Sequence, residues 1–171
     1  MHFTRRVCYF LFLVTRYFDN SMILKLRRLL VNCFLGQTIT NLFIRSNVLI
    51  FGYRNLRVGN DVSIHHGCFL SCEGGVTIGN FVSIAHGTSI LSSEHSYEDN
   101  SIPTKYQPVK YAAVKICDDV WIGANVTILA GVSLAKGTIV AAGSVVTKSV
   151  ADENTIIAGV PARHLKGRYN D

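Results

Sequence analysis

A regular spacing of six residues constrains this chain more than any other feature of its sequence. Branched aliphatic residues recur at this interval in three runs. They are Val58, Ile64 and Leu70, then Ile78, Ile84 and Ile90, then Ile116, Ile122, Ile128, Leu134, Val140 and Val146. Because six is the period of neither an α-helix nor a flat strand, the pattern predicts an all-β solenoid in which three hexapeptides form one triangular coil. The aliphatic side chains then fill the prism, and Gly and Asn occupy its tight turns.

Two interruptions of the repeat predict where the chain leaves the prism. Leu70 and Ile78 are eight residues apart, so Glu73, Gly74 and Gly75 are expected to bulge at a corner. Ile90 and Ile116 are twenty-six residues apart, which predicts a long loop at about 93–114. Loops that project from a rigid scaffold often carry function, so we expect chemistry here.

The segments outside the repeat are expected to close the two ends of the prism. We predict a helical segment over 1–45, the prism over 46–150 with an irregular first coil at Ile44 and Ile50, and a closing segment over 151–171. A helix is expected to start at Asp19–Ser21 and to cover the exposed strand edges. The predicted apolar face of this helix consists of Met22, Leu26, Leu29, Leu30 and Cys33. Lys25, Arg27 and Arg28 are expected to lie outside this face.

Positive charge is concentrated near the N-terminus. Residues 1–57 hold nine Lys and Arg against one Asp, a net charge of +8. Such a basic, apolar segment suits an anionic membrane surface better than nucleic acid, although a solubilising helix face would have the same composition. The apolar run from Val7 to Val14 follows Arg5 and Arg6, as in a signal peptide, but no small-residue cleavage site follows it. We therefore expect a cytoplasmic protein, with contact to the inner face of a membrane left open.

The five cysteines are an odd number and show no paired metal-ligand spacing. Free, inert thiols are the expected state, and no metal site is predicted.

Three motifs resemble those of a known family. They are the run from Cys117 to Val132 (CDDVWIGANVTILAGV), Ala142–Lys148 (AGSVVTK) and Ala158–Arg163 (AGVPAR). The chain resembles the hexapeptide-repeat acyltransferases, and most of all the maltose, galactoside and nodulation acetyltransferases and the O-acetyltransferases of bacterial surface polysaccharides. The resemblance implies a left-handed parallel β-helix, acetyl-CoA as acyl donor, a sugar hydroxyl of a surface polysaccharide or its precursor as acceptor, and a homotrimer with active sites between neighbouring prisms.

His95 is the candidate general base. An imidazole titrates near neutral pH and suits removal of a hydroxyl proton during attack on a thioester. His95 stands where the prism gives way to the long loop, as the catalytic histidine of the family does. Glu94, Asp99 or a backbone carbonyl is expected to orient its ring.

Positions for the acyl donor follow from register and resemblance. Counting two residues past the aliphatic position places His66, His86, Ala124 and Ala142 in one column, where small side chains leave room for a pantetheine arm. The resemblance implies that Trp121 lines the thioester end. It also implies coenzyme contacts at Ala124, Ala142, Thr147, Lys148, Arg163 and Lys166, the three cations being suited to phosphate oxygens.

Candidates for acceptor binding are Glu73 and His65. Relatives place Asp and Asn there, so both are departures that predict a different acceptor. An ordinary solvated turn residue is the alternative for Glu73.

Three other functions compete with this hypothesis. An antibiotic acetyltransferase of the same fold is the nearest, but those relatives carry a longer loop. A carbonic anhydrase of the γ class would need three histidine ligands, and Ala124 follows His66 and His86 in the column. A non-enzymatic solenoid would not need His95 and Trp121 in family positions.

Overall fold

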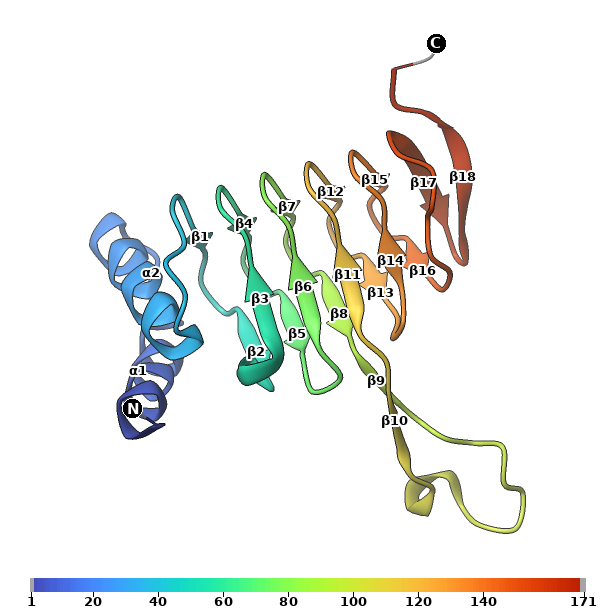
Figure 1. Cartoon of the computed structure of the whole chain (residues 1–171), viewed down its shortest axis with the longest axis horizontal. Coiled ribbons are helices and arrows are strands. Elements are labelled where there is room, and N and C mark those ends of the chain that lie inside the picture. Colours follow the sequence, from blue (N-terminus) through green and yellow to red (C-terminus); the bar gives the residue numbers. More distant parts are fainter. Residues whose placement is uncertain (1, 170–171) are drawn as a thin grey trace.

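A computed structural model describes residues 2–169 and shows a solenoid of parallel coils stacked along one axis. Two helices cover one end of the stack and an antiparallel β-hairpin closes the other (Figure 1). The predicted β-helix is therefore confirmed.

Three sheets form the faces of the prism. The seven-stranded sheet has the order β1 (Phe43–Ile44), β4 (Ser63–Ile64), β7 (Ser83–Ile84), β12 (Trp121–Ile122), β15 (Ile139–Val140), β17 (Thr155–Gly159) and β18 (Ala162–Gly167). The five-stranded sheet has the order β16 (Val145–Val146), β13 (Thr127–Ile128), β8 (Ser89–Leu91), β5 (Phe69–Ser71) and β2 (Leu49–Phe51). The four-stranded sheet has the order β14 (Ser133–Leu134), β11 (Val114–Ile116), β6 (Val76–Ile78) and β3 (Leu56–Val58). All of these neighbours pair in parallel except β17 and β18.

The core of the prism is the repeated aliphatic column. Every one of the twelve residues of the sixfold pattern is buried, the most accessible being Val58 at 9%. Register keeps like residues together: Ile64 pairs with Ile84, Ile84 with Ile122, and Ile122 with Val140. Burying a side chain of this size stabilises a fold by about 1.5–3 kcal/mol, so the column is the main source of stability.

Glycine follows the aliphatic position where coils approach closely. A Cβ on Gly79 would lie 2.3 Å from Oδ1 of Asp118 and 2.8 Å from its backbone nitrogen. Only glycine fits there without displacing the coil above, which explains the Ile-Gly pairs of the sequence.

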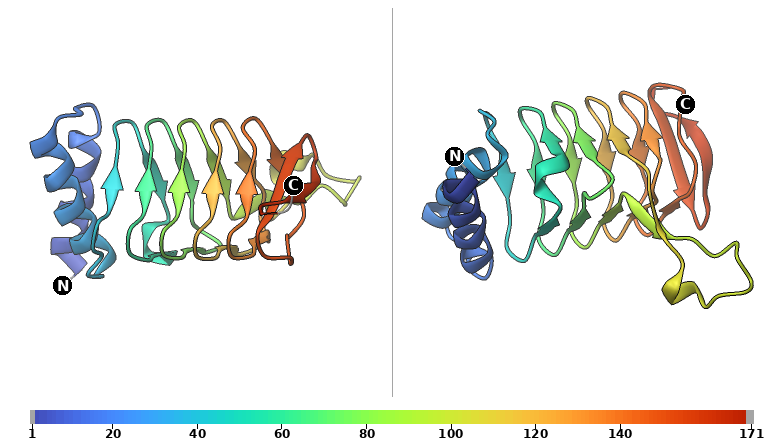
Figure 2. Two further views of the ribbon diagram at one scale, coloured as in Figure 1. Left: turned by 90° about the horizontal axis from the view of Figure 1, so that it is seen from above. Right: turned by 60° about the horizontal axis from the view of Figure 1, so that its bottom comes forward.

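The two N-terminal helices, α1 (His2–Thr15) and α2 (Ser21–Leu35), pack together against the first coils (Figure 2). The predicted start of α2 is confirmed, because Asn20 is the N-cap and its side chain accepts a hydrogen bond from the Ile23 backbone N–H at 2.9 Å. Sγ atoms of Cys8 and Cys33 lie 2.7 Å apart where the helices touch.

The predicted apolar face of α2 is wrong in most of its residues. Met22, Leu26 and Leu29 are exposed, and the buried residues are instead Arg27, Leu30, Val31, Phe34 and Leu35. The face is rotated because α2 packs on both α1 and the prism, and because the cation among these residues finds buried partners.

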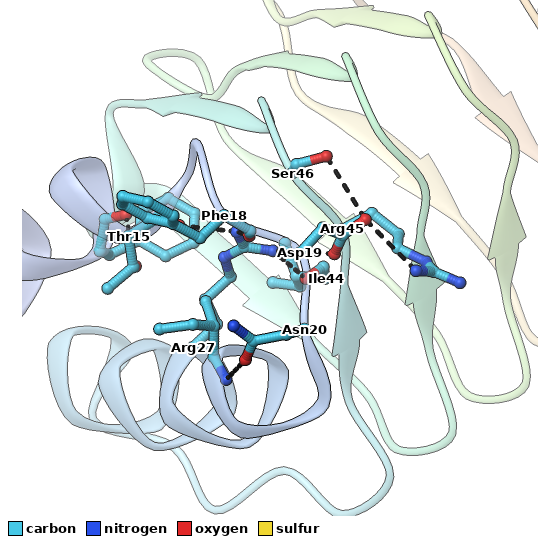
Figure 3. Close-up of polar contacts among 10 residues, drawn as sticks. Thr15, Phe18, Asp19, Asn20, Arg27, Ile44, Arg45 and Ser46 are labelled. Carbon is cyan, nitrogen blue, oxygen red and sulfur yellow. Dashed lines mark hydrogen bonds and ion pairs between the residues drawn. The ribbon is translucent and has the colours of Figure 1, made fainter.

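Arg27 is fully buried and ties the helices to the first coil (Figure 3). Its guanidinium donates to the backbone carbonyls of Thr15 (2.6 Å), Ile44 (3.1 Å) and Phe18. It also pairs with Asp19 at 3.5 Å, and Asp19 in turn pairs with Arg45 at 3.2 Å. Burial lowers the pKa of Arg27, and the charge of Asp19 opposes that shift.

The predicted long loop leaves the prism as a β-hairpin. Its strands are β9 (Ser93–His95) and β10 (Val109–Tyr111), which pair antiparallel. The tip projects well away from the coils (Figures 1 and 2) and contains a short 3₁₀ turn, Thr104–Tyr106. Gln107 is buried and braces the loop, since its side-chain amide donates to the carbonyls of Asp99 (2.7 Å) and Ile102 (3.1 Å).

Within residues 2–169, no helix has the length and apolar character required to cross a bilayer.

Candidate active site

Glu73 and the strand of His95 meet at one corner of the prism, where the five-stranded sheet gives way to the four-stranded sheet. Glu73 lies between β5 and β6, and its Oε2 accepts a hydrogen bond from Oγ of Ser71 at 2.7 Å. Oγ of Ser71 lies 3.4 Å from Oγ of Ser93 in β9. A short polar chain therefore connects Glu73 to the strand that ends in His95.

His95 is exposed at the base of the hairpin. It pairs with Val109 across the strands, and Ser93 pairs with Tyr111. Alternate residues of a strand share a face, so His95 and Ser93 point to the same side. In the part of the chain that the structure describes, the imidazole has no hydrogen-bond partner, and both of its ring nitrogens are available to a ligand.

Among residues 2–169, neither acidic candidate for orienting His95 forms a hydrogen bond to its ring. Asp99 accepts hydrogen bonds from the backbone N–H of Ser101 (2.8 Å) and from its hydroxyl. Glu94 is opposite Lys110 in the hairpin. It is the residue next to His95 in the strand, so the two side chains point to opposite faces.

The residues of the predicted column lie on a second corner, directly after the seven-stranded sheet, in stacked register. The rings of His66 and His86 stack at 5.0 Å with an angle of 6° between their planes. Backbone hydrogen bonds connect the coils here. The N–H of Asn125 donates to the His86 carbonyl at 2.9 Å, and the N–H of Gly143 donates to the Ala124 carbonyl at 2.8 Å. Ala124 is half-buried and Ala142 is exposed, and both place only a methyl group on this corner.

Trp121 lies in β12, within the seven-stranded sheet. It pairs with Ser83 on one side and Ile139 on the other, in the register that the sequence predicted. Its indole is 54% exposed, which leaves a broad aromatic surface uncovered in the single chain.

The cationic candidates gather at the C-terminal end. Lys148 and Arg163 line one cavity of about 390 Å³, together with His164 of β18. Thr147 precedes this cavity, and Lys166 sits opposite Ile156 in the terminal hairpin. The structure thus brings Lys148 and Arg163 together, as binding of one phosphate-bearing group requires.

His65 does not join Glu73. It follows β4, on the corner of the histidine column, and its ring lies edge-on to Phe43 at 6.4 Å. Burial lowers the pKa of His65, and the nearby charge of Arg45 adds to that effect. Within one chain, the column and the corner of His95 and Glu73 are therefore two separate sites.

A cavity of about 760 Å³ opens beside Glu73, between α1 and the corner of the prism. Its walls include Arg6 and Tyr9 from α1, Arg54 from the 3₁₀ turn Tyr53–Asn55, and Tyr111 from β10. The sequence showed Arg6 and Arg54 only as part of a net charge. Nothing in the hexapeptide pattern indicated that they would face Glu73.

Among residues 2–169, no group of three or more His, Cys, Asp or Glu side chains is arranged to hold a metal ion.

Comparison with known proteins decides the family. Residues 113–148 match the family described as "Bacterial transferase hexapeptide (six repeats)". A protein of Escherichia coli K12, named for O-acetyl transfer in lipopolysaccharide biosynthesis, is 33% identical over 129 residues, or 75% of this chain and 61% of that protein. This chain belongs to the hexapeptide-repeat acyltransferase family. The predicted resemblance is therefore confirmed.

Solved structures extend the likeness of this hexapeptide-repeat chain to its ends. A hexapeptide-repeat acetyltransferase from Vibrio cholerae superposes with a TM-score of 0.82 and 27% identity, covering 98% of this chain and 92% of that one. A second structure of that protein, at 26% identity and the same TM-score, is complexed with acetyl coenzyme A. Among the relatives by sequence, a galactoside O-acetyltransferase of Lactococcus lactis is 30% identical over 71% of this chain and 56% of its own length.

Proposed function

We propose that the protein transfers an acetyl group from acetyl-CoA to a sugar hydroxyl of a bacterial surface polysaccharide or its precursor. The observation that carries the proposal is His95, an exposed imidazole without a hydrogen-bond partner among the described residues, held at the base of a hairpin beside Glu73. The relatives support the chemistry: one is named for O-acetyl transfer in lipopolysaccharide biosynthesis, and one solved structure holds acetyl coenzyme A.

His95 acts as general base in a direct transfer. The acceptor oxygen bonds to the thioester carbon while its proton passes to the imidazole. The tetrahedral oxyanion is stabilised by a backbone N–H, then the C–S bond breaks and the imidazolium returns its proton to the leaving sulfur. No nucleophilic side chain is required, which agrees with the cysteines: burial raises the pKa of Cys72 to about 12 and that of Cys68 to about 11.

The donor lies along the column of small residues. Ala124 and Ala142 admit the pantetheine arm against the backbone, and Trp121 covers the thioester end. Thr147, Lys148, Arg163 and Lys166 bind the phosphates at the C-terminal end. The shared cavity of Lys148 and Arg163 supports this assignment, because two adjacent cations form charge-assisted hydrogen bonds to one anion.

A homotrimer completes the site. The donor column and the corner of His95 lie on different corners of one prism, so a neighbouring prism must supply the second half. Mixing two inactive variants, His95→Ala and a Lys148→Gln/Arg163→Gln double variant, tests this arrangement. Subunit exchange should restore part of the activity if sites are shared between chains. A mixture that stays inactive, or an active monomer by mass measurement, would contradict a shared site.

The acceptor lies against Glu73, with His65 as a second polar contact contributed at the neighbouring corner. Glu73 has one carboxylate oxygen bonded to Ser71 and the other free to accept from a sugar hydroxyl.

The exposed side of α1 provides a peripheral membrane contact. Phe3, Val7, Phe10, Leu11 and Val14 form an exposed apolar stripe on this helix, flanked by the basic residues of the segment. Helices of this kind lie in the membrane interface and are attracted to anionic lipids.

An antibiotic acetyltransferase is the second candidate. A protein of Lysinibacillus sphaericus named as a macrolide acetyltransferase is 34% identical over 63% of this chain. Incubating the protein and acetyl-CoA with panels of sugars, glycan fragments and antibiotics, and looking for the mass of one added acetyl group, separates the two. Acetylation of antibiotics alone would overturn the proposal.

A further inference from the structure

We infer that the cavity beside Glu73 binds a phosphate of the acceptor, so that the acceptor is a phosphate- or diphosphate-linked sugar rather than a neutral one. The inference rests on the proposed acetyl transfer and specifies its acceptor.

The basic wall of the cavity consists of Arg6 and Arg54. Neither guanidinium forms an ion pair within residues 2–169, although both belong to the most basic part of the chain. Arg54 also borders a smaller cavity with Arg5 and Arg57, so further positive charge surrounds this wall. Two free guanidiniums on one cavity are suited to bind phosphate oxygens in pairs.

The cavity also contains one acidic side chain, which is linked through serines to the strand of the reactive histidine. Among residues 2–169, Glu73 is the only carboxylate that lines the cavity, and one of its oxygens accepts a hydrogen bond from Ser71. The cavity thus offers a carboxylate oxygen to hydroxyl groups and two guanidiniums to an anion.

Aromatic side chains also line the cavity. The rings of Tyr9 and Tyr53 lie 4.6 Å apart, and Tyr9 also donates its hydroxyl to the Ile50 carbonyl at 2.6 Å. Burial raises the pKa of Tyr9, so its hydroxyl stays protonated. Rigid aromatic faces of this kind pack against the apolar face of a sugar ring.

The cavity and His95 are about one sugar apart. Tyr111 lines the cavity and pairs with Ser93, and His95 lies two residues further along β9. Two residues of a strand span roughly 7 Å, which matches the size of one hexose. A sugar whose phosphate meets Arg6 and Arg54 can therefore present a hydroxyl to His95.

The phosphate can belong to a lipid or to a soluble nucleotide. Arg6 is carried by α1 at the edge of its exposed apolar stripe, so a membrane-bound phosphate can reach the cavity. The two sources share the same recognition chemistry and differ in the experiment.

The test is a calorimetric titration of the full chain with inorganic pyrophosphate in saturating coenzyme A, which occupies the other phosphate site. Arg6→Gln and Arg54→Gln should each weaken binding about tenfold, and the double variant should abolish it. Arg28→Gln, which removes a cation of the same segment outside this cavity, should bind as the unaltered protein does. Arg54→Lys should recover part of the affinity.

Two further titrations identify the source: uridine diphosphate in solution, and phosphatidylcholine vesicles that contain an isoprenoid phosphate. Binding of either one that is lost in the double variant supports the inference. Equal pyrophosphate affinity of the double variant and the unaltered protein, or no binding by either, would overturn it. His95→Ala should lose acetyl transfer and keep pyrophosphate binding, so failure of the catalytic proposal is seen separately.

Discussion

In the prism, buried aliphatic side chains repeat from coil to coil, whereas the main buried contact of the helical pair occurs once. Ile84 pairs with Ile64 on one side and with Ile122 on the other, in the same register. The single side chain of Arg27 donates to three backbone carbonyls, those of Thr15, Phe18 and Ile44. In the prism, many similar contacts therefore share the stabilisation, whereas at the helical end much of it depends on Arg27.

The largest effect on stability is expected at that unique contact. Arg27→Ala removes a fully buried guanidinium from three backbone carbonyls and from its ion pair with Asp19, and should lower the free energy of unfolding by about 3–5 kcal/mol. Urea denaturation measures the change. Arg28→Ala, its neighbour on α2, should change stability by no more than about 0.5 kcal/mol. Equal losses for both variants would contradict the role given to Arg27.

Substitution of a core residue of the prism should lower the free energy of unfolding slightly less. Ile122→Ala removes a fully buried side chain and should destabilise the protein by about 2–5 kcal/mol, with the value set by how far adjacent coils relax. Ile102→Ala in the projecting loop is the matched control, because that side chain is 40% exposed. If the two substitutions had the same effect in urea, the repeated column would not be the stabilising core.

The difference between the regions also explains what the sequence could predict. A period of six fixes which residues face inward at twelve positions, and strand register then places Trp121 beside Ser83 and Ala142 above Ala124. The face of α2 could not be read in the same way, because an amphipathic pattern assumes one apolar side and a solvated one. α2 contacts two partners, and a buried cation reverses the expected assignment.

The candidate site follows the same division. His95, Glu73 and the donor column lie at positions set by the repeat and its interruptions. Arg6, Arg54 and Tyr111 come together only when α1 and the hairpin are placed against the prism. Such contacts join segments far apart in sequence and leave no periodic signal.

The C-terminal end of the prism should show a moderate effect on donor binding. Lys148→Gln and Arg163→Gln should each weaken acetyl-CoA binding about tenfold, which corresponds to about 1.4 kcal/mol, because each removes a charged donor to a phosphate. Calorimetry measures the change, with Lys136→Gln as an exposed lysine outside their shared cavity. Unchanged affinity for acetyl-CoA in both variants would show that the coenzyme phosphates do not bind at this end of the prism.

The smallest effect is expected at the helical end. Phe10→Ser shortens the exposed apolar stripe of α1 and should reduce binding to vesicles of anionic lipid several-fold while stability stays nearly unchanged. Vesicle flotation measures the bound fraction, and Tyr106→Ser in the distant loop is the control. Equal binding by Phe10→Ser and the unaltered protein would mean that α1 does not touch the bilayer.

The catalytic assignment is tested most directly by comparing turnover with donor affinity in His95→Ala. Acetyl transfer should fall by about 10²–10⁴, as expected for loss of a general base, while calorimetry shows unchanged affinity for acetyl-CoA. Turnover equal to that of the unaltered protein would show that His95 is a surface residue and that the chemistry takes place elsewhere.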